Sequence, residues 1–354
     1  MQELDRLVGA LVRRKAGGAE TDASHGCDGT RRELPSAPVL LTHFVRRCVV
    51  VAAAAALAGC GATAPQGTIT FSGVVEGTPG IYDVDVNGTH LRRLAVAGSQ
   101  LAWSPDGSSL AFVRDGGIWT VSPPDATARR VVRGPVYEYS WSPDGSRFAY
   151  RGDDFRLLVA TRGGAVRRLT GDGRDPVWSP DGTLVAFLTS VAHINDQGED
   201  EYVAVVRPDG TGRQRMQVAL ATGVAWSPDS RRLTFAAPAE GLRDGSAARL
   251  YTTRVDGTDL RVVVPQARFD PQGGDWSPDG ARIAYADATG TWVVDSDGGH
   301  LHRVSALAFA AWSRDGKWVA VQGARVVEVV PASGGTARRV IDADSIDSVT
   351  WRPG

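Results

Sequence analysis

A five-residue motif, Trp-Ser-Pro-Asp-Gly, recurs along the chain and limits its possible folds more than any other feature of the sequence. Copies and close variants of the motif begin at seven tryptophans: Trp103, Trp141, Trp178, Trp226, Trp276, Trp312 and Trp351. Successive tryptophans are 38, 37, 48, 50, 36 and 39 residues apart. Repeats of this length indicate an array of equivalent units, each of which buries its apolar face only against its neighbours.

Each repeat has the pattern of four short strands. An apolar segment such as 110–112 follows the motif, a second strand such as 118–121 comes next, and a turn such as Asp256-Gly257 precedes the last strand. In the motif, proline fits the second turn position, and glycine fits the position where a positive φ is often needed. We expect the tryptophan to fill the wedge between neighbouring units. Four-stranded units in a closed array predict an all-β fold, the β-propeller.

The two ends of the chain predict how the ring closes. Residues 68–97 supply three strands but no tryptophan strand, and one strand, 346–351, is left over at the C-terminus. Pairing of these ends would complete a four-stranded blade and leave no unpaired edge at the seam. We therefore predict a seven-bladed propeller over residues 68–354, with a six-bladed ring containing one degenerate unit as the alternative.

The sequence before the repeats predicts an export signal. Residues 48–58 form an apolar run of 11 residues behind Arg46 and Arg47. Such a run is too short to cross a bilayer but typical of a signal peptide. The segment Leu57-Ala58-Gly59-Cys60 resembles the lipobox of bacterial lipoproteins, in which the cysteine is diacylated and becomes the first mature residue.

We accordingly expect a signal peptide over residues 45–59, lipidation of Cys60, a tether over residues 60–67 and the propeller from residue 68. Residues 1–44 are either a disordered extension or sequence upstream of the true start of translation. Because two acyl chains anchor a protein stably, the mature chain would be held at the outer side of a bacterial membrane, in the cell envelope.

The repeat also resembles that of a known family. The motif followed by Leu-Ala-Phe at 110–112, together with Ile-Tyr or Ile-Trp strands at 81–82 and 118–119, resembles the repeats of TolB-like, or PD40, β-propellers. The resemblance covers about residues 68–354. The family includes periplasmic protein-binding propellers, propellers of bacterial lipoproteins and the gating propellers of prolyl-oligopeptidase-like enzymes. The resemblance therefore implies a fold and leaves the function open.

Charge and motifs argue against several classes of function. The chain has 39 basic and 40 acidic side chains and a net charge of −1, so we expect no nucleic-acid partner. No serine has glycine two residues before and after it, as a nucleophile elbow requires, and there is no Walker loop. The pair His300 and His302 lacks a third metal ligand at matched spacing. We expect a protein that is not an enzyme and has no cofactor and no metal. We also expect a monomer.

Two insertions predict which face of the propeller binds a partner. The longer spacings place extra residues at 190–201 and 238–248, between the second and third strands of adjacent blades. These loops share a face with the segments that lead into each inner strand, and loops on a rigid scaffold often carry function. We expect a protein or peptide to bind there through residues of these segments: Gln100, Tyr137, Glu138, Asp175, Asp196, Glu199, Asp270, Gln272 and Phe309.

Two other functions use residues of the same face. Carboxylates at the mouth of the central channel, such as Glu138, Asp175 and Asp270, could serve a hydrolase or lyase. The aromatic side chains in these segments could instead stack on the sugars of an envelope glycan: Tyr137, Phe269 and Phe309.

Overall fold

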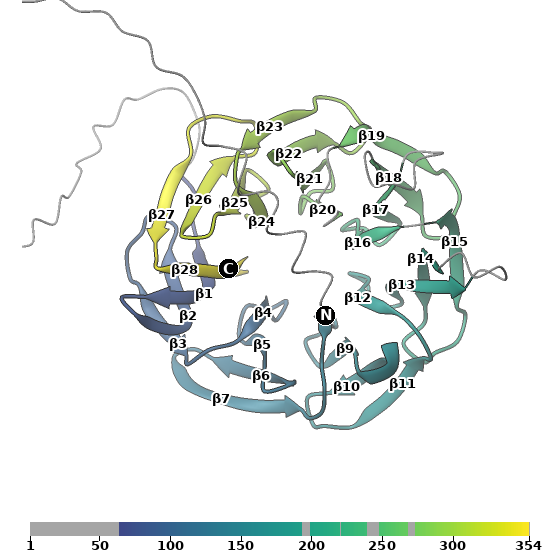
Figure 1. Cartoon of the computed structure of the whole chain (residues 1–354), viewed down its shortest axis with the longest axis horizontal. Coiled ribbons are helices and arrows are strands. Elements are labelled where there is room, and N and C mark those ends of the chain that lie inside the picture. The colour runs from purple at the N-terminus through teal and green to yellow at the C-terminus, as the bar shows by residue number, and fades with distance from the viewer. Residues whose placement is uncertain (1–63, 193–198, 220, 239–247, 268–272, 354) are drawn as a thin grey trace, which may run out of the picture. The chain divides into compact units, whose positions relative to one another are not determined.

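The chain folds into a ring of small antiparallel sheets. The computed structural model describes residues 64–192, 199–219, 221–238, 248–267 and 273–353. In this part of the chain, strands β1 to β28 form seven four-stranded sheets around a central axis (Figure 1). The predicted all-β propeller with seven blades is confirmed, and the six-bladed alternative is wrong.

Blades are numbered in chain order, and the strands of each are given from the axis outward. Blade 1 contains β28 (Ser345–Trp351), β1 (Thr68–Val75), β2 (Thr78–Asp85) and β3 (Arg92–Ala95). Blade 2 contains β4 (Ser99–Trp103), β5 (Leu110–Arg114), β6 (Gly117–Ser122) and β7 (Asp125–Val132). Blade 3 contains β8 (Glu138–Trp141), β9 (Arg147–Arg151), β10 (Leu157–Thr161) and β11 (Val166–Thr170).

The remaining blades repeat this order. Blade 4 contains β12 (Arg174–Trp178), β13 (Val185–Ala192), β14 (Glu199–Val206) and β15 (Gln214–Ala219). Blade 5 contains β16 (Thr222–Trp226), β17 (Arg232–Pro238), β18 (Ala248–Arg254) and β19 (Arg261–Ala267). Blade 6 contains β20 (Gly274–Trp276), β21 (Arg282–Asp287), β22 (Gly290–Asp295) and β23 (His302–Ser305). Blade 7 contains β24 (Ala308–Trp312), β25 (Trp318–Gln322), β26 (Val326–Pro331) and β27 (Arg338–Asp342).

Helix is almost absent from the described residues. They contain a single turn of 3-10 helix, η1 (Asp153–Phe155). No helix in this part of the chain has the length and apolar character needed to span a membrane.

The two chain ends close the ring in blade 1. β28 pairs antiparallel with β1, so that Trp351 lies opposite Ile69 and Val349 opposite Phe71. The register shifts at Gly73, where a Cβ atom would lie 2.1 Å from the carbonyl oxygen of Ser345. Only glycine permits this approach of two backbones, which lets the last strand join the first hairpin.

The repeat tryptophans lie between blades, as predicted. All seven are buried, with exposed fractions between 5% and 8%. Trp226 packs in one apolar cluster with Leu188 and Val203 of the preceding blade, and its Nε1 donates to the carbonyl oxygen of Val177 at 3.0 Å. The indole therefore supplies both apolar contact and a hydrogen bond to the neighbouring inner strand.

The serine of the motif has a role that sequence reasoning did not assign. In blade 3, the buried Oγ of Ser142 donates to Asp144 at 2.5 Å and accepts the amide of Arg147 at 2.9 Å. The same carboxylate accepts the amide of Ser146 at 3.0 Å. These hydrogen bonds, led by the one from Ser142, hold the pKa of Asp144 at about 2. The turn is thus a small polar core that needs an ionised aspartate.

Candidate functional site

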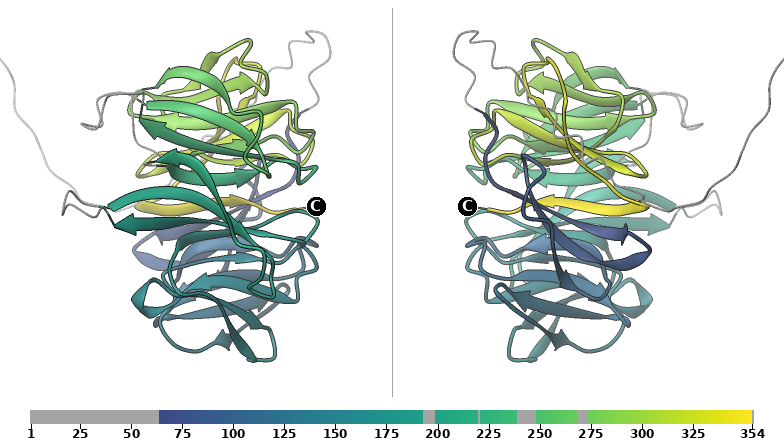
Figure 2. Two further views of the ribbon diagram at one scale, coloured as in Figure 1. Left: turned by 90° about the vertical axis from the view of Figure 1, so that its right-hand side faces the viewer. Right: turned by 90° about the vertical axis from the view of Figure 1, so that its left-hand side faces the viewer.

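The alternating strand directions give the ring two distinct faces. Each inner strand ends at a Trp-Ser-Pro-Asp turn or a variant of it, and we call the face that carries these turns, beginning at 103–107, the turn face. The inner strands start at the opposite face, which also receives the β13–β14 and β17–β18 connections, and we call it the loop face. Figure 2 shows the ring from the side, with the C-terminus at one of its two faces.

Four of the predicted site residues come together on the loop face. Gln100, Tyr137 with Glu138, and Asp175 stand at the starts of the inner strands of blades 2, 3 and 4. Gln100 Nε2 donates to the carbonyl oxygen of Tyr137 at 2.5 Å, and the amide of Asp175 donates to Glu138 Oε2 at 2.9 Å. Contacts across two blade boundaries therefore join these residues into one surface.

The other predicted residues lie outside this surface or are not described. Phe309 also stands three positions before a repeat tryptophan, on the loop face of blade 7, and its half-buried ring packs edge-on against Trp312 with centroids 6.4 Å apart. Glu199 begins β14, but its side chain is outside the described part. Three residues of the binding-face prediction and one of the glycan prediction fall outside the described residues: Asp196, Asp270, Gln272 and Phe269. The lipobox (57–60) also falls outside them.

Two residues of this surface have a backbone conformation that side chains disfavour. Gln100 (φ 53°) and Asp175 (φ 51°) are left-handed, and both lie three positions before the repeat tryptophan. Blades 5 and 6 have glycine there, Gly223 and Gly273, and a Cβ on Gly273 would lie 3.0 Å from the backbone of Gly223. Non-glycine residues in this region cost about 1–3 kcal/mol and concentrate at functional sites.

Charged side chains extend the surface from blade 3 to blade 4. Arg151 Nη2 lies 2.8 Å from Glu138 Oε1, and Arg174 Nη1 lies 3.0 Å from Asp175 Oδ2. Arg174 also makes a bidentate pair with Glu201, with Nε 2.6 Å from Oε1. Three carboxylates thus share two guanidinium groups. Burial first, and then the nearby charge of Glu138, raise the pKa of Asp175.

An aromatic stack borders the charged residues. The guanidinium carbon of Arg151 lies 4.7 Å from the ring centroid of Tyr137 and 5.2 Å from that of Phe155. Both rings are open to solvent, with exposed fractions of 48% and 59%. Phe155 and the preceding Asp154 are both left-handed, with φ of 57° and 54°. A bulky residue rarely adopts this conformation, which here holds an aromatic ring in water.

Sequence reasoning missed the residues that connect this surface. Arg151 ends β9, Phe155 ends η1 and Arg174 begins β12, in segments that gave no motif. The only available signal was that Arg174 and Asp175 lie a few residues before a repeat tryptophan. The glycan prediction grouped Tyr137 with Phe309, whereas the structure pairs Tyr137 with Phe155 through Arg151.

The inner strand of blade 6 carries a further titratable group. The residue just before the repeat tryptophan is Asp275 in blade 6. In the other six blades it is small or apolar: Ala102, Ser140, Val177, Ala225, Ala311 and Thr350. The side chain of Asp275 on the inner strand β20 is reached by water, yet surrounding protein desolvates it and raises its pKa to about 6. Its carbonyl oxygen accepts the indole N–H of Trp312 at 3.1 Å.

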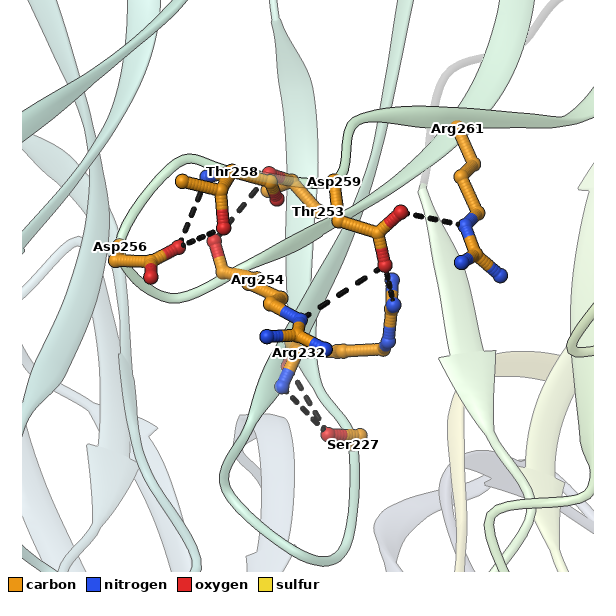
Figure 3. A network of polar contacts seen from close by, with 8 residues as sticks. All are labelled: Ser227, Arg232, Thr253, Arg254, Asp256, Thr258, Asp259 and Arg261. Atoms are coloured by element: carbon orange, nitrogen blue, oxygen red, sulfur yellow. Dashed lines mark hydrogen bonds and ion pairs between the residues drawn. The ribbon is translucent and has the colours of Figure 1, made fainter.

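A second charged cluster lies on the turn face of blade 5. Figure 3 shows three arginines around Asp259, whose carboxylate lies 2.7 Å from Arg261 Nε and 3.8 Å from Arg254 Nε and also pairs with Arg232. The hydrogen bond from Arg261 is the first cause of the lowered pKa of Asp259. A cavity of about 320 Å³ beside it is lined by Arg232, Arg261 and three aspartates: Asp229, Asp279 and Asp297. Because these charges compensate one another, the cluster fits a structural role.

Metal-ligating side chains do not gather among the described residues. No group of three or more His, Cys, Asp or Glu side chains there has the arrangement needed to hold a metal ion.

Comparison with solved structures confirms the TolB-like propeller fold. The chain matches TolB from Acinetobacter baumannii with a TM-score of 0.53 and 16% identity, over 81% of this chain and 67% of that one. It matches an oligogalacturonate lyase in complex with manganese with a TM-score of 0.61 and 16% identity, over 75% and 86% of the two chains. It matches the tricorn protease with a TM-score of 0.55 and 13% identity, over 82% and 36% of the two chains. These identities support a shared fold alone.

One curated relative is similar in sequence. The "Uncharacterized peptidase YuxL" of Bacillus subtilis is 31% identical over 116 residues, which is 31% of this chain and 16% of the relative. No family model matches the chain.

The expectation that the chain is not an enzyme is contradicted by the sequence relative, which is named as a peptidase. The expectation rested on missing nucleophile and metal motifs.

Proposed function

We propose that the loop face of blades 2 to 4 binds a protein or peptide, and that it does so by holding an exposed basic side chain of that ligand. The observation that carries the proposal is the stack of Tyr137, Arg151 and Phe155 beside the pair Glu138 and Asp175. The named peptidase relative supports a peptide as the class of ligand.

Charge and ring exposure favour a cationic group on the ligand. Among the described ion pairs that join blades 3 and 4, three carboxylates share two guanidinium groups, so the carboxylates are in excess by one. A ligand arginine or lysine would supply the missing positive charge and could lie against an exposed ring, since cations bind to aromatic faces. The left-handed backbone at Gln100 and Asp175 supports the proposal, because strained backbone conformations concentrate at functional sites.

A pair of labelled peptides tests this proposal. One peptide carries a central arginine flanked by glycine and serine, and its partner has glutamine in place of the arginine. Fluorescence anisotropy should show the arginine peptide binding at least ~10-fold more tightly, because a paired charge at a partly buried site contributes about 1.5–3 kcal/mol. Asp175→Asn and Phe155→Ala should each weaken its binding, and the turn-face variant Asp256→Asn should not. Equal affinity for the two peptides would contradict the proposal.

A second candidate function is acid–base catalysis by Glu138 and Asp175. One specific observation favours it: Asp175, with a raised pKa, donates its backbone amide to the carboxylate of Glu138, which in turn pairs with Arg151 at 2.8 Å. Two carboxyl groups in unlike environments can act as acid and base. Incubation with a mixed peptide substrate and with an oligosaccharide, followed by mass spectrometry, tests the candidate. Turnover that disappears in Asp175→Asn and in Glu138→Gln would support it, and turnover unchanged in both variants would exclude these residues.

We also propose that the propeller acts in the cell envelope, anchored by lipid on Cys60. The sequence Leu57-Ala58-Gly59-Cys60 behind an 11-residue apolar run supports this location. Mass spectrometry of protein from bacterial membranes should find an N-terminal diacylglyceryl-cysteine, and its loss in Cys60→Ser should release the protein from the membrane fraction.

A further inference from the structure

The propeller receives its N-terminal segment at the turn face. Gly67 accepts a hydrogen bond from the amide of Val86 at 3.1 Å, and a Cβ on Gly67 would lie 2.7 Å from Nε1 of Trp351. Ala64, Gln66 and Gly67 line a cavity of about 690 Å³ together with residues of the blade 7 turn and of the C-terminal end: Ser313, Arg314, Asp315, Trp351 and Arg352. The described chain therefore begins beside the turn of blade 7.

Strand direction explains this position. β1 is the second strand of its blade and pairs antiparallel with the inner strand β28. β28 runs from the loop face to the turn face, so β1 must start at the turn face. The stack of Tyr137, Arg151 and Phe155 lies on the opposite face, at the starts of the inner strands.

The turn beside this entry point departs from the repeat in charge. The turn of blade 7 has Arg314 at the motif's proline position, and Lys317 follows three residues later. The other five internal turns have proline at this position: Pro105, Pro143, Pro180, Pro228 and Pro278. Arg314 and Lys317 are both exposed. The carboxylate of Asp315 accepts hydrogen bonds from Ser313 Oγ at 2.7 Å and from the amide of Lys317 at 3.1 Å, so it is engaged within the turn.

We infer that the turn face of blades 7 and 1 rests on an anionic lipid surface, with Arg314 and Lys317 at the headgroups, so that the loop face points away from the membrane. The inference rests on the proposed lipid anchor at Cys60. The charges agree with it, because basic residues near an anionic membrane bind its headgroups within about one Debye length.

Chain length decides between the two possible orientations. The four residue steps from Cys60 to Ala64 span at most ~14 Å when extended. The eight residues of β1, which cross the blade from one face to the other, span about 26 Å. A tether shorter than the blade holds the turn face near the bilayer and leaves the loop face free for a partner.

Labelling of single cysteines tests this orientation. The chain has cysteine only at positions 27, 48 and 60, so the propeller residues allow a unique label. The full-length lipoprotein is produced in a bacterium as Lys317→Cys or as Phe155→Cys, labelled with an environment-sensitive dye and reconstituted in vesicles of phosphatidylcholine with 30 mol% phosphatidylglycerol and a headgroup quencher. We expect quenching at position 317 at least ~3-fold stronger than at position 155. Stronger quenching at position 155 would overturn the inference.

Two controls separate this inference from the proposed function. Mass spectrometry of the same samples reports the lipid on Cys60. If the protein carries lipid but position 155 is the one quenched, only the proposed orientation is contradicted. If the protein carries no lipid and does not bind the vesicles, both the lipid anchor and the orientation are contradicted. Arg314→Gln, with the label at position 317, reports the role of charge. It should weaken quenching on vesicles with phosphatidylglycerol and leave it unchanged on pure phosphatidylcholine, and an equal effect on both would contradict the headgroup contact.

Discussion

The guanidinium carbon of Arg352, the third-last residue of the chain, lies 4.3 Å from the ring centroid of Trp103 in blade 2. Arg352 Nε also donates to the carbonyl oxygen of Gly107 at 3.1 Å, and a Cβ on Gly107 would lie 2.3 Å from the carbonyl oxygen of Pro353. The C-terminus therefore completes blade 1 through β28 and then continues onto the first repeated turn. The seam of the ring is held by more than strand pairing.

We predict that Arg352→Ala weakens this seam. Loss of the cation–π contact and of the hydrogen bond to Gly107 should lower the free energy of unfolding by about 1–2 kcal/mol. Urea denaturation measures the change, and hydrogen exchange should rise in β28 and β1. Arg114→Ala is the matched control, because Arg114 stacks on Trp119 at 4.6 Å within a single blade. Faster exchange in β28 for the control variant as well would argue against a role specific to the seam.

Acid should destabilise the propeller through its repeated turns. Hydrogen bonds from the turn serines hold the pKa of Asp106 and Asp144 at about 2, below the value of about 3.9 for an unfolded chain. A carboxyl with a depressed folded-state pKa contributes stability above the unfolded value and loses it as pH falls towards the folded value. The free energy of unfolding should therefore fall between pH ~4 and ~2.

Substitution of one turn aspartate checks this explanation. Asp144→Asn should be less stable than wild type at pH 7, and the difference should narrow towards pH 2. Thermal unfolding across this pH range measures both effects. Asp347→Asn, at an exposed carboxylate outside the repeated turns, is the control, and it should leave the stability at pH 7 unchanged.

Asp275 should have the opposite effect on pH dependence. Its pKa of about 6 lies above the unfolded value of about 3.9, so its contribution to stability declines as pH rises from ~4 to ~6. We predict that Asp275→Asn is more stable than wild type at pH 7 and indistinguishable from it at pH 4. Chemical denaturation at the two pH values tests this, and a variant that is less stable at pH 7 would show that the ionised carboxylate has a favourable partner.

Asp175→Gly should separate stability from ligand binding. Glycine adopts the left-handed conformation without strain, as it does at the same repeat position in blades 5 and 6, and the change also removes repulsion from Glu138. We expect stability to rise by about 1 kcal/mol. Affinity for the arginine peptide should fall, as measured by anisotropy. Asp175→Asn, which keeps a side chain tolerated in this conformation, should lose affinity without the gain in stability.

The repeat allowed most of the fold to be predicted, because its residues act locally and identically in every blade. Proline, aspartate and glycine specify a tight turn, and the tryptophan that precedes them packs between neighbouring blades. The number of motifs therefore predicted the number of blades. The match between residues 68–97 and the leftover strand at 346–351 then predicted the seam, which the pairing of Ile69 with Trp351 confirms.

Half of the candidate site was predictable for a similar reason. Gln100, Glu138 and Asp175 stand at fixed distances before the repeat tryptophans, so their shared face followed from the strand order. Arg151 and Phe155 were not predictable, because they reach the site from the far end of β9. The expectation of a non-enzymatic chain was wrong because it rested on absent motifs rather than on any measured property.

The amino-acid sequence alone determined the number of blades, the closure of the ring and the face at which each inner strand starts, since periodic local turns and alternating strands impose these features. Only the tertiary structure decided which side chains meet. The pairing of Arg151 with Glu138 and two aromatic rings, and the position of the N-terminal segment beside Trp351, depend on the contact between blades. Such contacts join residues with no fixed spacing in the chain, so no periodic pattern records them.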